Sequence, residues 1–507
     1  MSTVIEEAPP AARTDAARRP WPAVLALAGF EARRLLLRMP VLFMLAAYAV
    51  WIGWRTHSAW YGYPALQDAD RATQTGPLMV GLAVLLCVDQ AVLRSQRHAT
   101  EAHFGVLVLE PWRRTVAHAL SVVPVAAVVA VGVAVQFGRQ AAESGAVGSG
   151  SVGELLVGPL SVLLFGAAGV LLARVVRRPF AVPLTVALLF FLFVAGPFSA
   201  GSGEGAVRWL SPVVTETGGN TFPADLLGRP AGWHALYLTG LALALALLAV
   251  VVAGGRTKLV TAALAGSVVL GTVGAAGQAG GVPAAVTAAR VRASVTPEQV
   301  QSCARHGRST YCAFPDWMPR TGTWARVADH VQALTGGTAR TDRLLVRQRV
   351  EARYGLDGDG AIAPFSARGQ VSVGTEWGGP RVPEFSAAVA SVLVTGDEKA
   401  AGEVCDGRMV TIMWLALGWQ SDPVSQLSAV RLDDSVEGSA IVVSQTEPLS
   451  MTAGQTTVVR ELFTAGEKAV APRVKAHWAE LTAPKVTTDR VAELLGVKAP
   501  READKCV

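Results

Sequence analysis

The stretch HFGVLVLEPWRRTVAH, residues 103–118, is a short charged piece that runs from one long apolar segment into the next. It contains a carboxylate, a proline, a tryptophan and two adjacent arginines. A helix of about 20 mostly apolar residues crosses the roughly 30 Å hydrocarbon core of a bilayer. The neighbouring residues 76–93 and 115–137 fit this length and composition. The stretch therefore predicts a connection between two membrane spans.

The composition is typical of a membrane protein. Of the 507 residues, 51% are hydrophobic and 17% are charged, against about 25% charged residues in soluble domains. The net charge is +6, but Lys and Arg do not form a stripe with interleaved aromatic residues, as a nucleic-acid site would require. We therefore expect membrane lipids, and no nucleic acid, among the partners of this chain.

Seven segments are apolar enough to be candidate spans. The first is the shortest, and Arg38 at its edge is expected to reach back to the lipid headgroups. Pro124 predicts a kink in the third. The seven segments cover residues 40–54 (with a start as early as Leu35), 76–93, 115–137, 154–173, 179–200, 233–253 and 259–279.

The distribution of Lys and Arg predicts the orientation, because short cytoplasmic loops carry an excess of these residues. Residues 1–20 are polar and lack the apolar core of a signal peptide, which predicts a disordered cytoplasmic tail. The side of the N-terminus receives Arg33, Arg34, Arg38, Arg94, Arg97, Arg113, Arg114, Arg174, Arg177, Arg178, Arg256 and Lys258. The opposite side receives only Arg55, Arg71, Arg139, Arg208 and Arg229. The chain is thus expected in the plasma (cytoplasmic) membrane with everything after Ala279 outside.

Residues 280–507 change character and predict an extracytoplasmic, soluble mixed α/β domain. Charges become frequent, and no segment stays apolar for twenty residues. The runs AAVASVLV (387–394) and SAIVVSQ (439–445) predict strands. Helices are expected at 323–334, 400–418 and 487–497, the last capped by Thr487 or Thr488.

Four of the five cysteines lie in this C-terminal region, which fits an outward-facing domain that keeps disulfides. Four cysteines allow three pairings. We favour Cys303 with Cys312, which leaves Cys405 with Cys506. Cys303, His306 and Cys312 as zinc ligands are an alternative, disfavoured because no fourth ligand is visible. Cys87 lies in a predicted span and is expected to be a small packing residue.

Motif searches indicate no catalytic site and no bound cofactor or metal. The glycines Gly148, Gly150 and Gly153 match GxGxxG, but they lie in a loop between spans rather than in a βαβ unit. GxxxxGK[ST], GxSxG and HExxH do not occur in the sequence. The chain therefore carries no recognisable machinery for nucleotide, ester or zinc-dependent peptide hydrolysis.

Polar residues inside the spans are candidates for function because they are expensive in a membrane. Asp89 and Gln90 form such a candidate site near the inner end of the second span. The alternative for Asp89 is a carboxylate at the interface that is either reached by water or paired with an arginine. The small-residue spacings at 262–266 and 277–281 are expected to let helices approach closely rather than bind a ligand.

The regions before the first span and after the second predict amphipathic helices on the inner membrane surface. PAVLALAGFEARRLLLR, residues 22–38, has apolar residues on one side and charges on the rest. ATEAHFGVLVL, residues 99–109, places Phe104, Leu107 and Val108 on one face, and Pro111 then starts the next span.

With this order of elements, residues 21–253 resemble a type 2 ABC-transporter permease, the membrane subunit of an ATP-driven exporter. The resemblance is carried by EARRLLLRMP, RSQRHATEAHFGVLVLEPWRRTVAH, the RRP turn before the fifth span, RWLSPVV and RPAGWHALYL. It implies a six-span bundle, to which residues 254–279 add a seventh span and residues 280–507 an outer domain. It further implies that residues 208–229 form an outer re-entrant region.

The resemblance also implies the partners and the site that contacts them. The partners are separate ATPase subunits, which carry the ATP, and a second permease copy or a homologous permease. The residues that couple to the ATPase are expected to be Phe104, Leu107, Glu110, Pro111, Trp112, Arg113 and Arg114. An alternative function is a membrane sensor or receptor whose outer domain binds a ligand, and a third is a membrane-tethered enzyme. For EPWRR alone, the alternative is a helix start with a tryptophan and arginines that anchor it at the interface.

Overall fold

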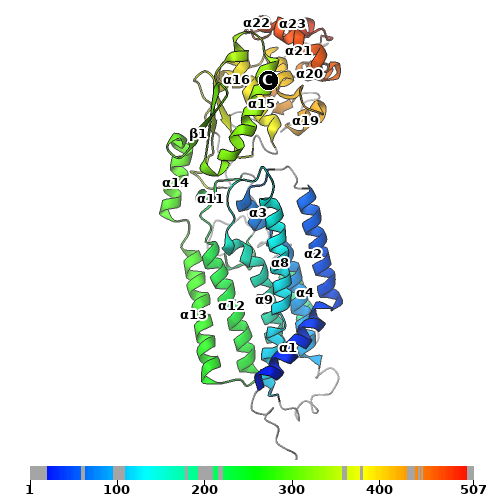
Figure 1. The fold of residues 1–507 in the computed structure, drawn as a ribbon, viewed down its shortest axis with the longest axis vertical. Coiled ribbons are helices and arrows are strands. Elements are labelled where there is room, and N and C mark those ends of the chain that lie inside the picture. The colour runs from blue at the N-terminus through cyan, green and yellow to red at the C-terminus, as the bar shows by residue number, and fades with distance from the viewer. Residues whose placement is uncertain are drawn as a thin grey trace, which may run out of the picture.

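The computed structural model is a bundle of long helices with the C-terminal residues packed at one end of it (Figure 1). The connection between α12 and α13, together with α1, lies at the other end. The structure describes residues 20–58, 63–94, 109–176, 181–191, 209–214, 221–356, 362–376, 381–430, 440–442, 446 and 449–499.

The bundle consists of helices that mostly agree with the predicted spans. Among the described residues, five stretches are long and apolar enough to cross a membrane, or six if the bent pair of α1 and α2 counts as one span. The helices are α1 (Pro20–Leu36), α2 (Met39–Ser58), α3 (Leu66–Ala72), α4 (Thr75–Val92), α7 (Pro111–Leu120), α8 (Val123–Ala141), α9 (Val152–Val175), α10 (Ala181–Phe190), α11 (Ala224–Leu227), α12 (Ala231–Val252) and α13 (Lys258–Ala279).

The second, third, fourth, sixth and seventh predicted spans correspond to α4, α7 with α8, α9, α12 and α13. The first corresponds to α2. The third is interrupted between Leu120 and Val123, next to the predicted kink at Pro124. Of the predicted fifth span, the structure describes the helix α10 and the following residue, and the rest lies outside the described residues. The count of seven therefore stays a prediction.

The helix α1 is bent by 63° from α2, so the residues before the first span form a separate element. Arg38, at the junction, does not reach away from the bundle as expected. Its Nη1 donates to the backbone oxygen of Cys87 and to Oε1 of Gln90, both at 3.1 Å. The reason is that α4 offers two acceptors close to the start of α2, so Arg38 joins these two helices.

The helices α12 and α13 pack closely because glycines face the partner helix. A Cβ added at Gly240 would overlap the backbone of Gly271, and one at Gly277 would overlap the ring of Trp233. The predicted close approach at 277–281 is therefore confirmed for Gly277. Within the chain, a Cβ at Gly266 would meet nothing within 4 Å, so the expectation for 262–266 stays a prediction.

The C-terminal region contains a mixed four-stranded sheet in the order β1-β2-β3-β4, covered by helices. The strands β1 and β2 are antiparallel, while β2, β3 and β4 run parallel. Two further strands, β5 and β6, pair antiparallel. The strands are β1 (Ser302–His306), β2 (Ser309–Ala313), β3 (Leu345–Gln348), β4 (Gln370–Val373), β5 (Ala440–Val442) and β6 (Leu449–Met451).

The helices of this region surround a core that contains the fully buried Trp317, Trp324 and Trp414. They are α14 (Ala284–Val295), α15 (Thr321–Leu334), α16 (Val382–Thr395), α17 (Glu398–Gly402), α18 (Arg408–Leu417), α19 (Pro423–Ala429), α20 (Ala453–Ala465), α21 (Glu467–Ala476), α22 (Trp478–Leu481) and α23 (Thr488–Leu495). Short 3₁₀ helices are η4 (Pro297–Gln299), η5 (Pro315–Arg320) and η6 (Gly337–Thr341).

One predicted strand of this region is wrong. Residues 387–394 belong to the helix α16, most of whose residues are buried. A helix that is covered on all sides shows a continuous apolar run, which periodicity alone does not separate from a buried strand. The predicted strand at 439–445 is confirmed by β5, and the helix expected at 400–418 is divided into α17 and α18. Thr487 caps α23 as predicted.

The predicted disulfide is present, because Cys303 and Cys312 are bonded across the paired strands β1 and β2. Their thiolates are therefore not zinc ligands, and Nε2 of His306 instead lies 3.0 Å from Oγ1 of Thr321. Cys405 is also disulfide-bonded. Its predicted partner Cys506 lies outside the described residues, so that pairing stays a prediction. Cys87 is free and buried, as expected.

Candidate functional site

The predicted ATPase-coupling residues fall partly within the structure, at the start of α7. Phe104 and Leu107 lie outside the described residues. Pro111 is the first residue of α7, as predicted, and Glu110 precedes it. Nε1 of Trp112 donates to Oε2 of Glu110 at 2.6 Å, and Nε of Arg113 lies 3.3 Å from the same oxygen. Glu110 thus holds both side chains at the helix start.

Trp112 also contacts the connection between α12 and α13. Gly255, in the connection between α12 and α13, is buried against this side chain, and a Cβ there would lie 3.0 Å from Cβ of Trp112. The guanidinium of Arg113 lies 5.1 Å from the centre of the Trp112 ring. Arg114 is half-buried on the same helix. The EPWRR segment is therefore packed against the bundle through Trp112.

The helix α1 holds both ends of the undescribed segment 95–108. At one end, Arg94 donates two hydrogen bonds of 3.2 Å to the carboxylate of Glu31, which is buried on α1. At the other end, Leu109 packs against a cluster formed by Val24 and Ala28 of α1 and Ala117 of α7. A bidentate, charge-assisted pair fixes geometry as well as distance. The residues on either side of 95–108, the stretch that includes the predicted coupling residues Phe104 and Leu107, are thus both attached to α1.

The predicted intramembrane site at Asp89 and Gln90 lies on α4, close to this region. Asp89 is buried, with 1% of its surface exposed, and Gln90 is half-buried. Gln90 accepts a hydrogen bond from Arg38, so it serves at least to attach α2 to α4.

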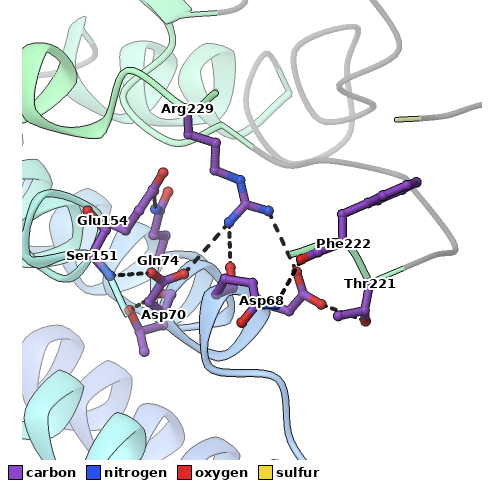
Figure 2. A network of polar contacts seen from close by, with 10 residues as sticks. Asp68, Asp70, Gln74, Ser151, Glu154, Thr221, Phe222 and Arg229 are labelled. Atoms are coloured by element: carbon purple, nitrogen blue, oxygen red, sulfur yellow. Dashed lines mark hydrogen bonds and ion pairs between the residues drawn. The ribbon is translucent and has the colours of Figure 1, made fainter. Parts of the chain in front are cut away.

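At the opposite end of the bundle, the structure shows a network of buried and half-buried charged and polar residues that the sequence did not predict (Figure 2). Its centre is Arg229, whose Nη2 lies 3.6 Å from Asp68 and whose Nη1 lies 3.9 Å from Asp70. Arg229 also donates to the backbone oxygen of Gln67. We call the set Asp68, Asp70, Gln74, Ser151, Glu154, Thr221 and Arg229 the outer polar network, after the end of the bundle that the sequence predicts to lie outside.

The outer polar network joins the starts of three long helices. Asp70, on α3, accepts a 2.7 Å hydrogen bond from the backbone N–H of Ser151, directly before α9. Gln74, directly before α4, donates to Glu154 in the first turn of α9. Arg229 lies two residues before α12. Thr221, in the loop before α11 and α12, donates a 2.8 Å hydrogen bond to Asp68 on α3.

The burial of these charges makes the network a functional candidate. The side chain of Asp70 is 2% exposed and that of Arg229 is 9% exposed, while Glu154 as a residue is 3% exposed. Removing charges from water is expensive, and a buried ion pair often contributes little net stability. Charges that stay buried despite this cost are therefore functional candidates, together with their partners.

The C-terminal domain contacts the loops that carry this network. Arg320 donates from Nη1 to the backbone oxygen of Thr375 at 3.1 Å and from Nη2 to that of Tyr63, a few residues before α3. Arg320 is 3% exposed, and burial lowers its pKa to about 10, so it remains charged at neutral pH. Asp316 accepts from the backbone N–H of Ala224 at 3.3 Å.

A third arginine and apolar side chains complete this junction. Arg290 of α14 donates from Nε to the oxygen of Leu226 at 2.8 Å and from Nη2 to that of Leu227 at 3.0 Å. These two carbonyls lie at the end of the short helix α11, where helical partners are missing. Phe222, Leu226 and Leu227 are also buried in the same core as Trp317.

The signals that could have revealed the outer network were present but weak. The sequence DADR, residues 68–71, and Glu154 lie at predicted span ends, where charges are ordinary. Only the fold brings Asp68 and Asp70 to Arg229, which lies far along the chain between other helices. Comparison of the chain with known protein families, curated proteins and solved structures finds no match.

Proposed function

We propose that the chain is the membrane permease subunit of an ATP-binding-cassette exporter. Separate ATPase subunits bind the ATP, and a second copy or a homologous permease completes the pathway. The protein lies in the plasma membrane with its N-terminus inside and its C-terminal domain outside, and it moves a substrate outward. The observation that supports this proposal best is that both ends of the segment 95–108 are fixed to α1, through Arg94 and Leu109.

The mechanism that we propose is a population shift driven from the inner end. A ligand or partner shifts a conformational equilibrium only if it binds one arrangement better than the other. Arg94 follows α4, and both Arg94 and Leu109 contact α1, so movement of an ATPase docked between them would reach α1 and α4. Trp112, which contacts Gly255, extends this connection to α12 and α13.

The second candidate function is a sensor whose outer domain binds a ligand and signals through the spans. It is supported by the core that Phe222 and Leu226 share with the C-terminal domain, because such a core would pass movement of the domain to the bundle. A sensor would not need an ATPase bound at the segment 95–108. The two candidates therefore differ in what binds the inner end.

The test is to purify the full chain from its native membranes in a mild detergent and to identify the proteins that accompany it. We expect a protein with the GxxxxGK[ST] motif to co-purify. Phe104→Asp and Leu107→Asp each place an unpaired carboxylate into the proposed contact, which is costly where the surface is buried. Each change should remove the ATPase while leaving the permease in the membrane.

The matched control is Val424→Asp, which places the same carboxylate at an apolar residue that is 45% exposed on the C-terminal domain. This variant should retain the ATPase. Recovery of a kinase or another signalling protein, with no ATPase in the parent preparation, would favour the sensor. Full recovery of the ATPase with both the Phe104→Asp and the Leu107→Asp variants would rule out the proposed docking site.

A further inference from the structure

The C-terminal domain forms hydrogen bonds with the same two loops that carry the outer polar network. One loop leads into α3, and Arg320 donates to Tyr63 within it. The guanidinium of Arg320 also lies 5.7 Å from the centre of the Tyr63 ring. The other loop leads into α12, and Asp316 accepts from Ala224 within it. Each contact is made by the 3₁₀ helix η5 of the domain.

These contacts lie a few residues from the charges that they would position. Tyr63 precedes Asp68 by five residues, and Ala224 precedes Arg229 by five. Asp68 and Arg229 approach each other to 3.6 Å. The domain therefore contacts both loops, the one that leads to Asp68 and the one that leads to Arg229.

The helix η5 is anchored in the core of the domain. Nε1 of Trp317, which is fully buried, donates to the oxygen of Thr375 at 2.7 Å, the same oxygen that Arg320 uses. A planar guanidinium with several donors fixes two carbonyls at once, which an ammonium does less well. Arg320 thus joins the centre of the domain directly to the loop before α3.

The network itself holds together the outer ends of α3, α9 and α12. Asp70 contacts both Arg229 and the backbone N–H of Ser151. Any opening of the outer end between these helices must break these contacts. Packed interfaces of this kind switch between discrete arrangements and do not deform continuously.

We propose that the C-terminal domain is a lock that holds the outer polar network closed. Release of Tyr63 and Ala224 by the domain frees Asp68 and Arg229 to separate, and the outer end of the bundle then opens. The inference rests on the proposed function only in identifying this opening with the exit of the substrate. The lock itself is a property of the chain alone.

The test measures access of water to a buried position below the network. Val157 of α9 is fully buried, one turn further into the bundle than Glu154. In a chain with Cys87→Ala and the other cysteines unchanged, Val157→Cys provides a single new thiol. The probe is a cationic, membrane-impermeant methanethiosulfonate reagent, applied to the full chain in sealed vesicles with the C-terminal domain facing the reagent.

We expect the thiol to be unreactive in the parent and to react at least ten-fold faster when either Arg320→Ala or Arg229→Ala is added. The variant R320K should give an intermediate rate, because an ammonium reaches only one of the two carbonyls well. The matched control R490A removes an arginine on α23 that pairs with Glu480 and Glu493 within the domain. It should react as slowly as the parent.

Three outcomes would overturn the proposal. Reactivity that rises with R229A but not with R320A would show that the domain does not control the network. No increase with either would show that the network is not a barrier, and an equal increase with R490A would show general loosening. If R320A does not fold, the reaction rate of R320K is used instead. A rate above that of the parent supports the proposal, and a rate equal to that of the parent shows that the domain does not control the network. The assay needs neither ATPase nor substrate, so its failure leaves the proposed function untouched.

Discussion

Replacing Gly240 by alanine tests how closely the seventh predicted span is joined to the bundle. A Cβ at Gly240 would overlap the backbone of Gly271, which cannot rotate away as a side chain can. Overfilling a well-packed contact costs about 1 to 3 kcal/mol, and a backbone obstacle favours the upper end of this range. Alanine favours the helix by about 0.5 to 1 kcal/mol over glycine. We therefore expect G240A to destabilise the protein by about 2 kcal/mol.

The matched control is Gly266→Ala on α13, because nothing lies within 4 Å of a Cβ at that position. G266A should leave the stability unchanged or raise it by up to about 1 kcal/mol through helix propensity. A Cβ at Gly274 would overlap the backbone of Tyr237, so G274A should behave as G240A does. At Gly271 the nearest atom to an added Cβ is 3.6 Å away, and G271A should be tolerated.

The assay is thermal unfolding of the purified full chain in detergent, followed by tryptophan fluorescence. The signal sums over the 13 tryptophans of the chain and therefore follows global unfolding. The expected order of stability places G266A and G271A together above G240A and G274A. If G240A unfolds at the same temperature as G266A, α12 and α13 do not approach through these glycines, and the reasoning is refuted.

Three further predictions concern the outer domain and the topology. Cys303→Ser and Cys312→Ser should each cost about 2 to 4 kcal/mol in unfolding free energy, and additive losses in the double variant would argue against a shared bond. With the buried free cysteine replaced, an impermeant thiol reagent on intact cells should label Tyr354→Cys and not Arg256→Cys, and the reverse pattern would invert the orientation. Burial raises the pKa of Asp406, but hydrogen bonds from an arginine and backbone amides outweigh this and lower it below its usual value. The stabilisation by ionised Asp406 is present above about pH 4 and is lost as the pH falls through the pKa of the folded state. D406N should therefore lower the melting temperature at pH 7 and make the melting temperature less dependent on pH in the acid range. An unchanged dependence of the melting temperature on pH would contradict this role of Asp406.

The positions of most spans were predictable because a bilayer demands long apolar helices, and α4, α9, α12 and α13 match the predicted segments within a few residues. The disulfide between Cys303 and Cys312 followed from sequence proximity in a domain expected outside. These features depend on local composition and on short distances along the chain, both of which can be read from the sequence.

Features that depend on contacts between distant residues were missed. Residues 387–394 read as a strand but form part of the buried helix α16, because a core covered on all sides hides the helical period. Arg38 was expected to reach the lipid headgroups, yet α4 provides its acceptors. The outer polar network brings together Asp70 and Arg229, which are ordinary span-end charges until the fold places them side by side.

The central claim is that residues 103–114, which include Phe104 and Leu107, couple an ATPase to the bundle. The most direct measurement is ATP hydrolysis by the cognate ATPase, reconstituted in membranes with the parent chain, with Phe104→Asp or with Leu107→Asp. We predict that the parent supports hydrolysis and that both variants lose it, while Val424→Asp behaves as the parent does. Unchanged hydrolysis with both variants, together with full recovery of the ATPase, would contradict the claim.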